Sequence, residues 1–462
     1  MQEKENEYKR PRYYLNKESE MPKIGFISVG HPDYISDASA MLKNKAIKSM
    51  EQNGIEVISA QETAADSQSA RLFAKKLVKH DLDGVVLFLE TWMECPVAMS
   101  AIREIEHLPF ALWGTPMYNN NGQSVSTGSF VSFAMFKGSL DRLEYNYEAI
   151  LGLPSQKSTI ESIKAFAIAA EAYSRMKITS IGLVGYTSMS IYPGTFDHLL
   201  MRKAVGPEIV QMDTYTLLNK MGEISDSECS DTIQYLKSVA KIRNDVTNEN
   251  LITVSKMYQA LKKICDIKQL SAINVKCQYE LSKEFGMTAC VPLSILAENG
   301  IVASCEGDIL VTVSMLMLSY LSNSIVAYAD IINVNEDNTI KLSPCGFIPY
   351  SFGDKDNREI RKFMPNVGFR GIQNSFVYKP GKVTLLRLVE DGFGYHIVYT
   401  VGTGLPTELR QGYMPALDID IGDKTQNFIA NLAGQHYAFC YGDFSSELNQ
   451  LTKIMKIQCI EI

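Results

Sequence analysis

The chain has 462 residues, a length that suggests two or three packed domains. Hydrophobic residues make up 46% and charged residues 21% of the sequence, which is typical of globular proteins and excludes a disordered chain. The formal net charge is −7, from 45 Lys and Arg against 52 Asp and Glu. We therefore expect no nucleic-acid partner, because phosphate binding needs clustered cations.

Cysteine usage and hydropathy indicate the compartment. Nine cysteines are scattered without a Cys-x-x-Cys pair, which favours reduced thiols over a disulfide framework or a zinc site. The first 22 residues are polar and lack the apolar core of a signal peptide. The longest apolar stretch, 309–321, is too short to span a bilayer. We expect a cytoplasmic protein that does not enter a membrane.

The first part of the chain alternates short apolar strands with amphipathic helices. This pattern predicts a doubly wound parallel sheet, in a domain over residues 1–157. The expected strands are 23–30, 55–60, 84–90 and 109–114, and the expected helices are 36–53, 67–79 and 96–106.

The same alternation continues over residues 158–336 and predicts a second domain of the same class. The expected helices are 159–176, 251–265 and 309–321, and the expected strands are 178–186, 271–277 and 325–335.

After about residue 335, helix patterns fade and short strands alternate with Gly and Pro turns. The segments 382–390, 395–402 and 416–423 predict an antiparallel β domain, 337–462, resembling a small barrel and ending with a helix at 445–455. The fold class expected for the whole chain is thus α/β: two doubly wound parallel-sheet domains followed by a C-terminal antiparallel β-barrel-like domain.

Familiar catalytic signatures are absent from the sequence. There is no Gly-x-x-x-x-Gly-Lys-Ser/Thr loop, no Gly-x-Gly-x-x-Gly fingerprint and no Gly-x-Ser-x-Gly elbow.

Three positions carry chemistry that the fold alone does not require. Glu306 and Asp308 precede an apolar helix, where Asp308 also fits a simple N-cap. Asp330 interrupts an apolar strand, and a buried carboxylate is costly without a cation. His436 lies in a segment of small and apolar residues, where a core histidine is the alternative. Two carboxylates and one imidazole suit Mn²⁺ or Mg²⁺ better than Zn²⁺, although the sequence does not show that they meet.

At these positions the chain resembles the L-fucose isomerase / L-arabinose isomerase family, which includes related sulfoquinovose isomerases. Glu306-Gly307-Asp308 is similar to the arabinose isomerase motif that carries a metal-binding Glu. The segments 305–308, 314–317 and 328–330, and the interval of 24 between Glu306 and Asp330, are similar to the fucose isomerase pattern. Residues 433–436, Ala-Gly-Gln-His, resemble the segment with the family's metal-binding His. The order of the three domains also agrees.

The resemblance implies a role for eight residues. Glu306, Asp330 and His436 would hold Mn²⁺ or another divalent cation, and Glu306 and Asp330 would also act as acid and base. The implied substrate contacts are Gln435, Lys276, Gln278, Cys345 and, by analogy with a segment that faces a neighbouring subunit, His31. For an anionic sugar we add Arg370, which has no acidic residue close to it in sequence.

The chain also departs from the family. Residues 343–346, Ser-Pro-Cys-Gly, stand where arabinose isomerases have a further His ligand. The chain is also shorter than fucose isomerases, so the sugar is left open.

The implied activity is aldose–ketose isomerisation of an open-chain sugar through an ene-diol. The substrate would be of the L-fucose or L-arabinose type or a 6-modified hexose, with sulfoquinovose isomerisation as the alternative within the family. A sugar-binding protein without catalysis is the alternative from another class. We also expect a homo-oligomer, in the form of a hexamer with shared active sites.

Overall fold

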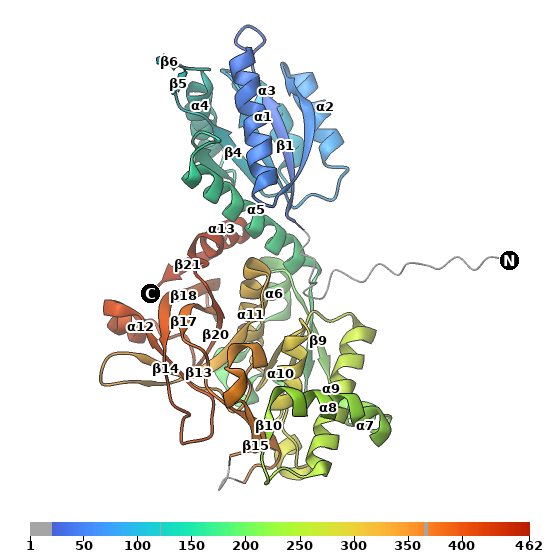
Figure 1. The fold of residues 1–462 in the computed structure, drawn as a ribbon. Coiled ribbons are helices and arrows are strands. Elements are labelled where there is room, and N and C mark those ends of the chain that lie inside the picture. The colour runs from blue at the N-terminus through green and yellow to red at the C-terminus, as the bar shows by residue number, and fades with distance from the viewer. Residues whose placement is uncertain (1–20, 121, 365–367) are drawn as a thin grey trace, which may run out of the picture. The chain divides into compact units, whose positions relative to one another are not determined.

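The structure is a computed structural model that describes residues 21–120, 122–364 and 368–462 (Figure 1). The N-terminal segment on which the expectation of no signal peptide rests lies almost wholly outside these residues. The chain forms two compact units. One contains the described residues up to Arg175 together with Ser446–Lys456, and the other contains Met176–Ser445 and Ile457–Ile462. The domain boundaries expected at 157/158 and 336/337 stay a prediction.

The first unit is built on a five-stranded parallel sheet, as the alternating pattern predicts. Its strand order is β2-β1-β3-β4-β7, with every pairing parallel. The strands are β1 (Lys23–Val29), β2 (Glu56–Ala64), β3 (Gly84–Leu89), β4 (Phe110–Gly114) and β7 (Glu148–Leu151). A short hairpin, β5 (Tyr118–Asn120) and β6 (Gln123–Val125), precedes the fourth helix.

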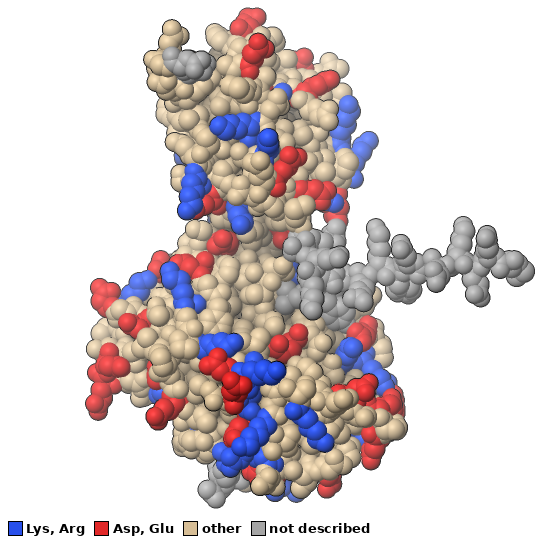
Figure 2. All heavy atoms as spheres, in the orientation of Figure 1, with Lys and Arg blue, Asp and Glu red and all other residues tan. Residues whose placement is uncertain are grey.

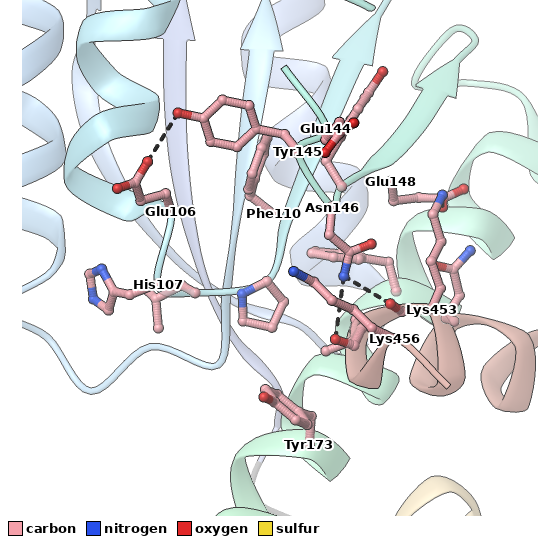
Figure 3. Close-up of a pocket in the computed structure, with 16 residues that line it drawn as sticks. Glu106, His107, Phe110, Glu144, Tyr145, Asn146, Glu148, Tyr173, Lys453 and Lys456 are labelled. Atoms are coloured by element: carbon pink, nitrogen blue, oxygen red, sulfur yellow. Dashed lines mark hydrogen bonds and ion pairs between the residues drawn. The ribbon is translucent and has the colours of Figure 1, made fainter. Parts of the chain in front are cut away.

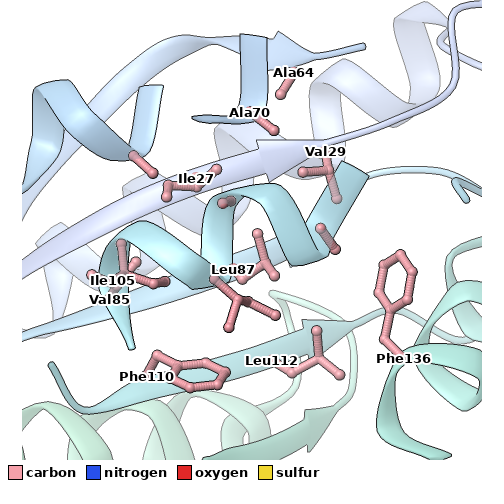
Figure 4. Packing of buried hydrophobic residues seen from close by; sticks show 14 of the residues in the cluster. Ile27, Val29, Ala64, Ala70, Val85, Leu87, Ile105, Phe110, Leu112 and Phe136 are labelled. Carbon is pink, nitrogen blue, oxygen red and sulfur yellow. The ribbon is translucent and has the colours of Figure 1, made fainter. Parts of the chain in front are cut away.

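Helices cover both faces of this sheet, because successive strand residues point to opposite sides. One face places Ile27, Leu87 and Leu112 against helices α2, α3 and α4 (Figure 4). The other face places Phe26, Phe88 and Trp113 against α1 and α5. The helices are α1 (Asp37–Gln52), α2 (Ser67–Leu77), α3 (Cys95–Ile105), α4 (Ser129–Arg142) and α5 (Lys157–Ile178).

The second unit contains a four-stranded parallel sheet of order β12-β11-β8-β9. The strands are β8 (Ser180–Val184), β9 (Glu208–Met212), β11 (Ala272–Val275) and β12 (Val302–Cys305). The helices around it are α6 (His198–Ala204), α7 (Thr214–Gly222), α8 (Ser230–Val239), α9 (Asn248–Lys268), α10 (Cys290–Glu298) and α11 (Ile309–Ser322). A smaller sheet joins β10 (Lys241–Ile242) to the hairpin β15 (Glu359–Lys362) and β16 (Ile372–Ser375).

The C-terminal part of the same unit is a mixed seven-stranded sheet of order β17-β20-β13-β14-β19-β18-β21. The sheet is mixed because β21 pairs in parallel with β18, whereas the other pairings are antiparallel. Its strands are β13 (Ala327–Val334), β14 (Ile340–Leu342), β17 (Gly381–Asp391), β18 (Gly394–Leu405), β19 (Leu417–Asp420), β20 (His436–Tyr441) and β21 (Gln458–Glu461). A multi-stranded sheet near the C-terminus is therefore confirmed, but it is mixed and not purely antiparallel as expected. A separate domain over 337–462 and closure of the sheet into a barrel stay predictions.

The last helix, α13 (Ser445–Met455), belongs with the first unit although it lies near the end of the chain. Its Ile454 packs against the core beneath α1 and α5. The amide Nδ2 of Asn146 donates to the carbonyl oxygens of Lys453 at 2.8 Å and Ile454 at 3.3 Å. A short helix, α12 (Thr425–Ala430), precedes β20.

The surface carries both charge signs close together. On the face shown in Figure 2, lysine and arginine side chains lie beside aspartate and glutamate side chains. Among these contacts, Glu359 pairs with both Lys241 and Arg243. No helix in the described part of the chain has both the length and the apolar character needed to cross a bilayer.

Candidate metal centre

Glu306 is held at the carboxyl end of β12 in a constrained backbone conformation. Its φ angle is +70°, and that of Gly307 is +73°. A residue other than glycine rarely adopts this left-handed region, and such outliers are concentrated at functional sites. The turn ends at Asp308, the N-cap of α11, whose carboxylate accepts the backbone N–H of Val311 at 3.0 Å. The N-cap role expected for Asp308 is thus confirmed.

Asp330 and His436 are brought together by strand pairing. They are directly opposite in the antiparallel register of β13 and β20. Side chains at such opposed positions lie on the same face and within reach of each other. His436 is fully buried, whereas the Asp330 side chain keeps 21% of its surface exposed.

The three side chains expected to bind a metal converge. His436 Nε2 lies 3.3 Å from Glu306 Oε2 and 3.3 Å from Asp330 Oδ1. One potential ligand atom from each residue lies within 4.8 Å of the other two.

The opposite side of the imidazole contacts a third carboxylate. His436 Nδ1 lies 2.9 Å from Asp308 Oδ2, and Arg387 Nη1 donates to the same oxygen at 3.1 Å. Asp308 and Arg387 are both fully buried. Arg387 also donates to the carbonyl oxygens of His436 at 2.7 Å and Ala433 at 3.1 Å. These contacts orient the ring, as carboxylates behind metal-bound histidines commonly do.

Gly434 permits the close approach of the arginine. Its φ angle is +149°, and a Cβ atom there would lie 2.7 Å from Arg387 Nε. A side chain at this position would therefore displace the guanidinium that supports Asp308.

The geometry leaves His436 Nε2 in need of a cation. With Nδ1–H donating to Asp308, the neutral ring directs the lone pair of Nε2 toward two carboxylates. Nε2 is buried and makes no hydrogen bond within the described residues. Facing lone pairs repel unless a proton or a metal ion lies between them. Two carboxylates and an imidazole form a donor set that fits a divalent cation.

The pKa shifts follow from these contacts. Burial raises the pKa of Glu306, but the contact with His436 outweighs it and the pKa is lowered. Burial also raises the pKa of Asp308, yet Arg387 and His436 lower it to about 2. For His436, burial lowers the pKa, but the three carboxylates raise it well above its ordinary value. Glu306 and Asp308 are thus ionised at neutral pH.

Two of the expected substrate contacts lie beside Glu306. Gln278 Nε2 donates to Glu306 Oε1 at 3.2 Å and to Cys345 Sγ at 3.4 Å. Cys345 Sγ in turn lies 3.4 Å from Glu306 Oε1. Both side chains therefore hold one oxygen of Glu306, while the other oxygen faces His436.

Lys276 follows β11, on the carboxyl edge of the sheet that also holds Glu306. Its side chain is almost fully buried, and Nζ lies 4.2 Å from the ring centre of Tyr186 and 5.3 Å from that of Tyr279. Nζ also pairs with the carboxylate of the half-exposed Glu280. Burial lowers the pKa of Lys276.

In the described residues, the side chains of the other expected contacts make no hydrogen bond or ion pair with the triad. Gln435 precedes His436, and its carbonyl accepts from Ile331 at 2.7 Å. Arg370 is exposed, and its guanidinium donates to the carbonyls of Lys283 and Glu284. His31 lies in the first unit, where its ring contacts those of Tyr34 and Trp92.

Sequence reasoning missed the second role of Asp308 and missed Arg387 altogether. A signal for Arg387 exists, because it is the one charged residue within the apolar run Val383–Val389. The same signal, a charge within a buried strand, pointed to Asp330.

The chain is similar to curated sulfoquinovose isomerases, while no family model matches it. It is 21% identical over 444 residues to the sulfoquinovose isomerase of Priestia aryabhattai, covering 94% of this chain and 97% of the relative. It is 24% identical over 329 residues to that of Alkalicoccus urumqiensis, covering 68% and 72%. Among solved structures, a carbohydrate transporter from Acidothermus cellulolyticus in complex with myo-inositol is 11% identical, covering 66% of this chain and 89% of that one. Its TM-score of 0.19 is too low to support a shared fold.

Asp308→Asn tests the support behind His436. We expect binding of Mn²⁺ to weaken about 10–100-fold, because the ring loses its orienting carboxylate. We also expect lower stability, by about 3–5 kcal/mol, because Arg387 keeps a buried charge without a counter-ion. Calorimetric titration and urea unfolding measure the two effects. Asp391→Asn is the matched control, since Asp391 contacts His396 at the surface. Unchanged Mn²⁺ affinity in Asp308→Asn would contradict the assigned role.

The raised pKa of His436 predicts proton release on metal binding. Without a metal, the ring keeps a proton at neutral pH, and a cation at Nε2 must displace it. We expect release of about one proton per ion, with affinity falling as the pH falls below the raised pKa of His436, because protons compete. Titration of Mn²⁺ in buffers with different ionisation enthalpies measures this release. A heat that is the same in all buffers would show that no proton leaves.

Proposed function

We propose that this protein is a metal-dependent aldose–ketose isomerase that acts on a sulfonated hexose, sulfoquinovose. The observation that carries the proposal is the buried Nε2 of His436, which faces Glu306 and Asp330 with no hydrogen-bond partner among the described residues. Similarity to sulfoquinovose isomerases over most of the chain supports sulfoquinovose as the substrate over L-fucose and L-arabinose.

Glu306, Asp330 and His436 would hold the cation, for which Mn²⁺ suits the oxygen-rich donor set. When bound, the cation supplies Lewis-acid stabilisation of the negative charge that develops on the sugar oxygens O1 and O2.

The two carboxylates of the triad carry the proton transfers in this proposal. Isomerisation takes a proton from C2 and returns a proton to C1, while the hydroxyl proton on O2 moves to O1. An ionised carboxylate serves as the base for the first step and as the acid for its return. Gln278 and Cys345 fix one oxygen of Glu306, which restricts the direction of its second oxygen. Asp330 is the more exposed of the two acids and is open to the substrate.

Lys276 is the proposed anchor for the sulfonate. Its buried ammonium lies between two tyrosine rings, at the sheet edge where parallel α/β sheets bind ligands. A sulfonate would replace the half-exposed Glu280 as its counter-ion. Cations held in such desolvated positions bind anions more strongly than exposed ones.

The remaining expectations stay predictions. They are substrate contacts by Gln435, Arg370 and His31, a homo-oligomer in the form of a hexamer, and a cytoplasmic location.

Metal removal and Glu306→Gln test the reaction. Chelation should abolish conversion of aldose to ketose, and Mn²⁺ should restore it. Glu306→Gln should lower kcat about 10²–10⁴-fold, because an amide neither accepts the proton nor balances the metal charge. Conversion is followed by proton NMR, with the exposed Glu336→Gln as the control. Full activity without metal, or sugar binding without any turnover, would contradict an isomerase and favour a binding protein.

Substrate identity is tested by comparing sulfoquinovose with L-fucose and L-arabinose. The wild type should convert sulfoquinovose with the highest kcat/KM, and Lys276→Met should raise KM for it at least tenfold. Lys283→Met is the matched control, because Lys283 is an exposed cation whose Nζ lies 5.1 Å from the ring centre of Tyr279. Turnover of the neutral sugars alone would reject the sulfonated substrate. If Arg370→Ala loses the preference for sulfoquinovose over the neutral sugars and Lys276→Met keeps it, Arg370 and not Lys276 binds the sulfonate.

A further inference from the structure

The first unit contains a pocket of about 530 Å³, and none of the residues of the metal centre lines it (Figure 3). It lies at the amino ends of β4 and β7, the opposite edge of the sheet from His31. Its walls come from residues 106–110, residues 144–148, α5 and α13. The volume is within the range of small-molecule sites, about 300–1,000 Å³.

Aromatic rings form much of the wall. The ring of Phe110 stacks on Tyr147 at 5.8 Å and meets Tyr145 edge-on at 6.3 Å. Tyr173 of α5 lines the pocket from another side. Such surfaces bind the C–H faces of a ring compound.

Two of the charges around the pocket balance each other, and a third accepts a hydrogen bond from a neighbour. Lys453 Nζ pairs with Glu148 at 2.6 Å, and the Tyr145 hydroxyl donates to Glu106 at 3.0 Å. Lys456 makes no ion pair within the described part of the chain. Figure 3 shows its side chain extending from the end of α13 below Asn146, whereas Glu106 and Glu144 lie beside Tyr145. The Lys456 side chain therefore approaches the pocket from a different side than Glu106 and Glu144.

One amide oxygen in the wall lacks a donor, and a second can accept a hydrogen bond. Gln450 Oε1 is buried and has no hydrogen-bond partner within the described residues. Asn146 donates its Nδ2 to two carbonyls of α13, which leaves Oδ1 as its acceptor. A buried acceptor without a donor costs free energy, about 1–3 kcal/mol, that a ligand hydroxyl recovers.

We infer that this pocket binds an anionic monosaccharide, a hexose carrying a phosphate or a sulfonate. The anion pairs with Lys456, the hydroxyls donate to the amide oxygens of Asn146 and Gln450, and the sugar ring packs on Tyr173. A nucleotide also offers an anion and a ring, but its ribose carries fewer hydroxyl donors than a hexose phosphate does. The site is separate from the metal centre and does not depend on the proposed reaction.

The test is calorimetric titration of the full-length protein with glucose 6-phosphate. Wild type should bind it saturably, at least tenfold more tightly than glucose or inorganic phosphate, each of which satisfies only part of the pocket. Lys456→Met should weaken binding at least tenfold. The matched control, Lys48→Met, replaces an exposed lysine of α1 and should change nothing. His107→Gln, at an exposed position of the wall, provides a second variant and should weaken binding less.

Further titrations identify the anion and separate this site from the catalytic one. The same titrations of wild type and Lys456→Met are repeated with sulfoquinovose. They show whether the phosphate or the sulfonate loses more affinity when Lys456 is replaced. Glu306→Gln should retain glucose 6-phosphate binding, because the metal centre is not involved. The inference is overturned if neither anionic sugar binds saturably, if Lys456→Met binds as wild type does, or if Glu306→Gln abolishes binding. Tighter binding of AMP than of glucose 6-phosphate would also overturn it.

Discussion

The imidazole of His436 is in contact with three carboxylates while fully shielded from water, and this arrangement constrains the rest of the site. Nδ1 is satisfied by Asp308, whose charge is balanced by Arg387. Nε2 faces Glu306 and Asp330, and no lysine or arginine of the described residues forms an ion pair with either carboxylate. A buried cluster with this excess of negative charge is stable only with a proton or a metal ion, so its electrostatics favour cation binding.

The ligand atoms are positioned by three different structural devices. Glu306 depends on a left-handed turn after β12, a conformation that costs free energy and persists because α11 begins immediately afterwards at Asp308. Asp330 and His436 depend on the register of β13 against β20, and a slip of one residue would turn one of them to the other face. The site therefore connects the parallel sheet to the mixed sheet within one unit.

Charged residues inside apolar elements mark the parts of this molecule where packing alone does not explain the sequence. Asp330 in β13 and Arg387 in β17 are examples, and Lys276 directly after β11 is a further buried charge. Asp330 contacts His436, Arg387 pairs with Asp308 and Lys276 pairs with Glu280. In the first unit, by contrast, the central strands β1, β3 and β4 are apolar on both faces apart from Lys23 and Ser28 near the ends of β1. The sheets of the two units thus differ in the charged groups that they contain.

Local hydrophobic patterns were enough to predict the alternation of strands and helices, the parallel sheets and the helix at 445–455, because hydrophobic periodicity is a property of neighbouring residues in the chain. It also marked Glu306, Asp330 and His436 as unusual. It did not reveal α10, whose residues are apolar on almost every side and lack a periodic signal. The support of the imidazole by Asp308 and Arg387, and the packing of α13 with the first unit, became evident only in the folded chain. Such contacts join residues as far as 308 positions apart, and they depend on strand register and packing that no local pattern encodes.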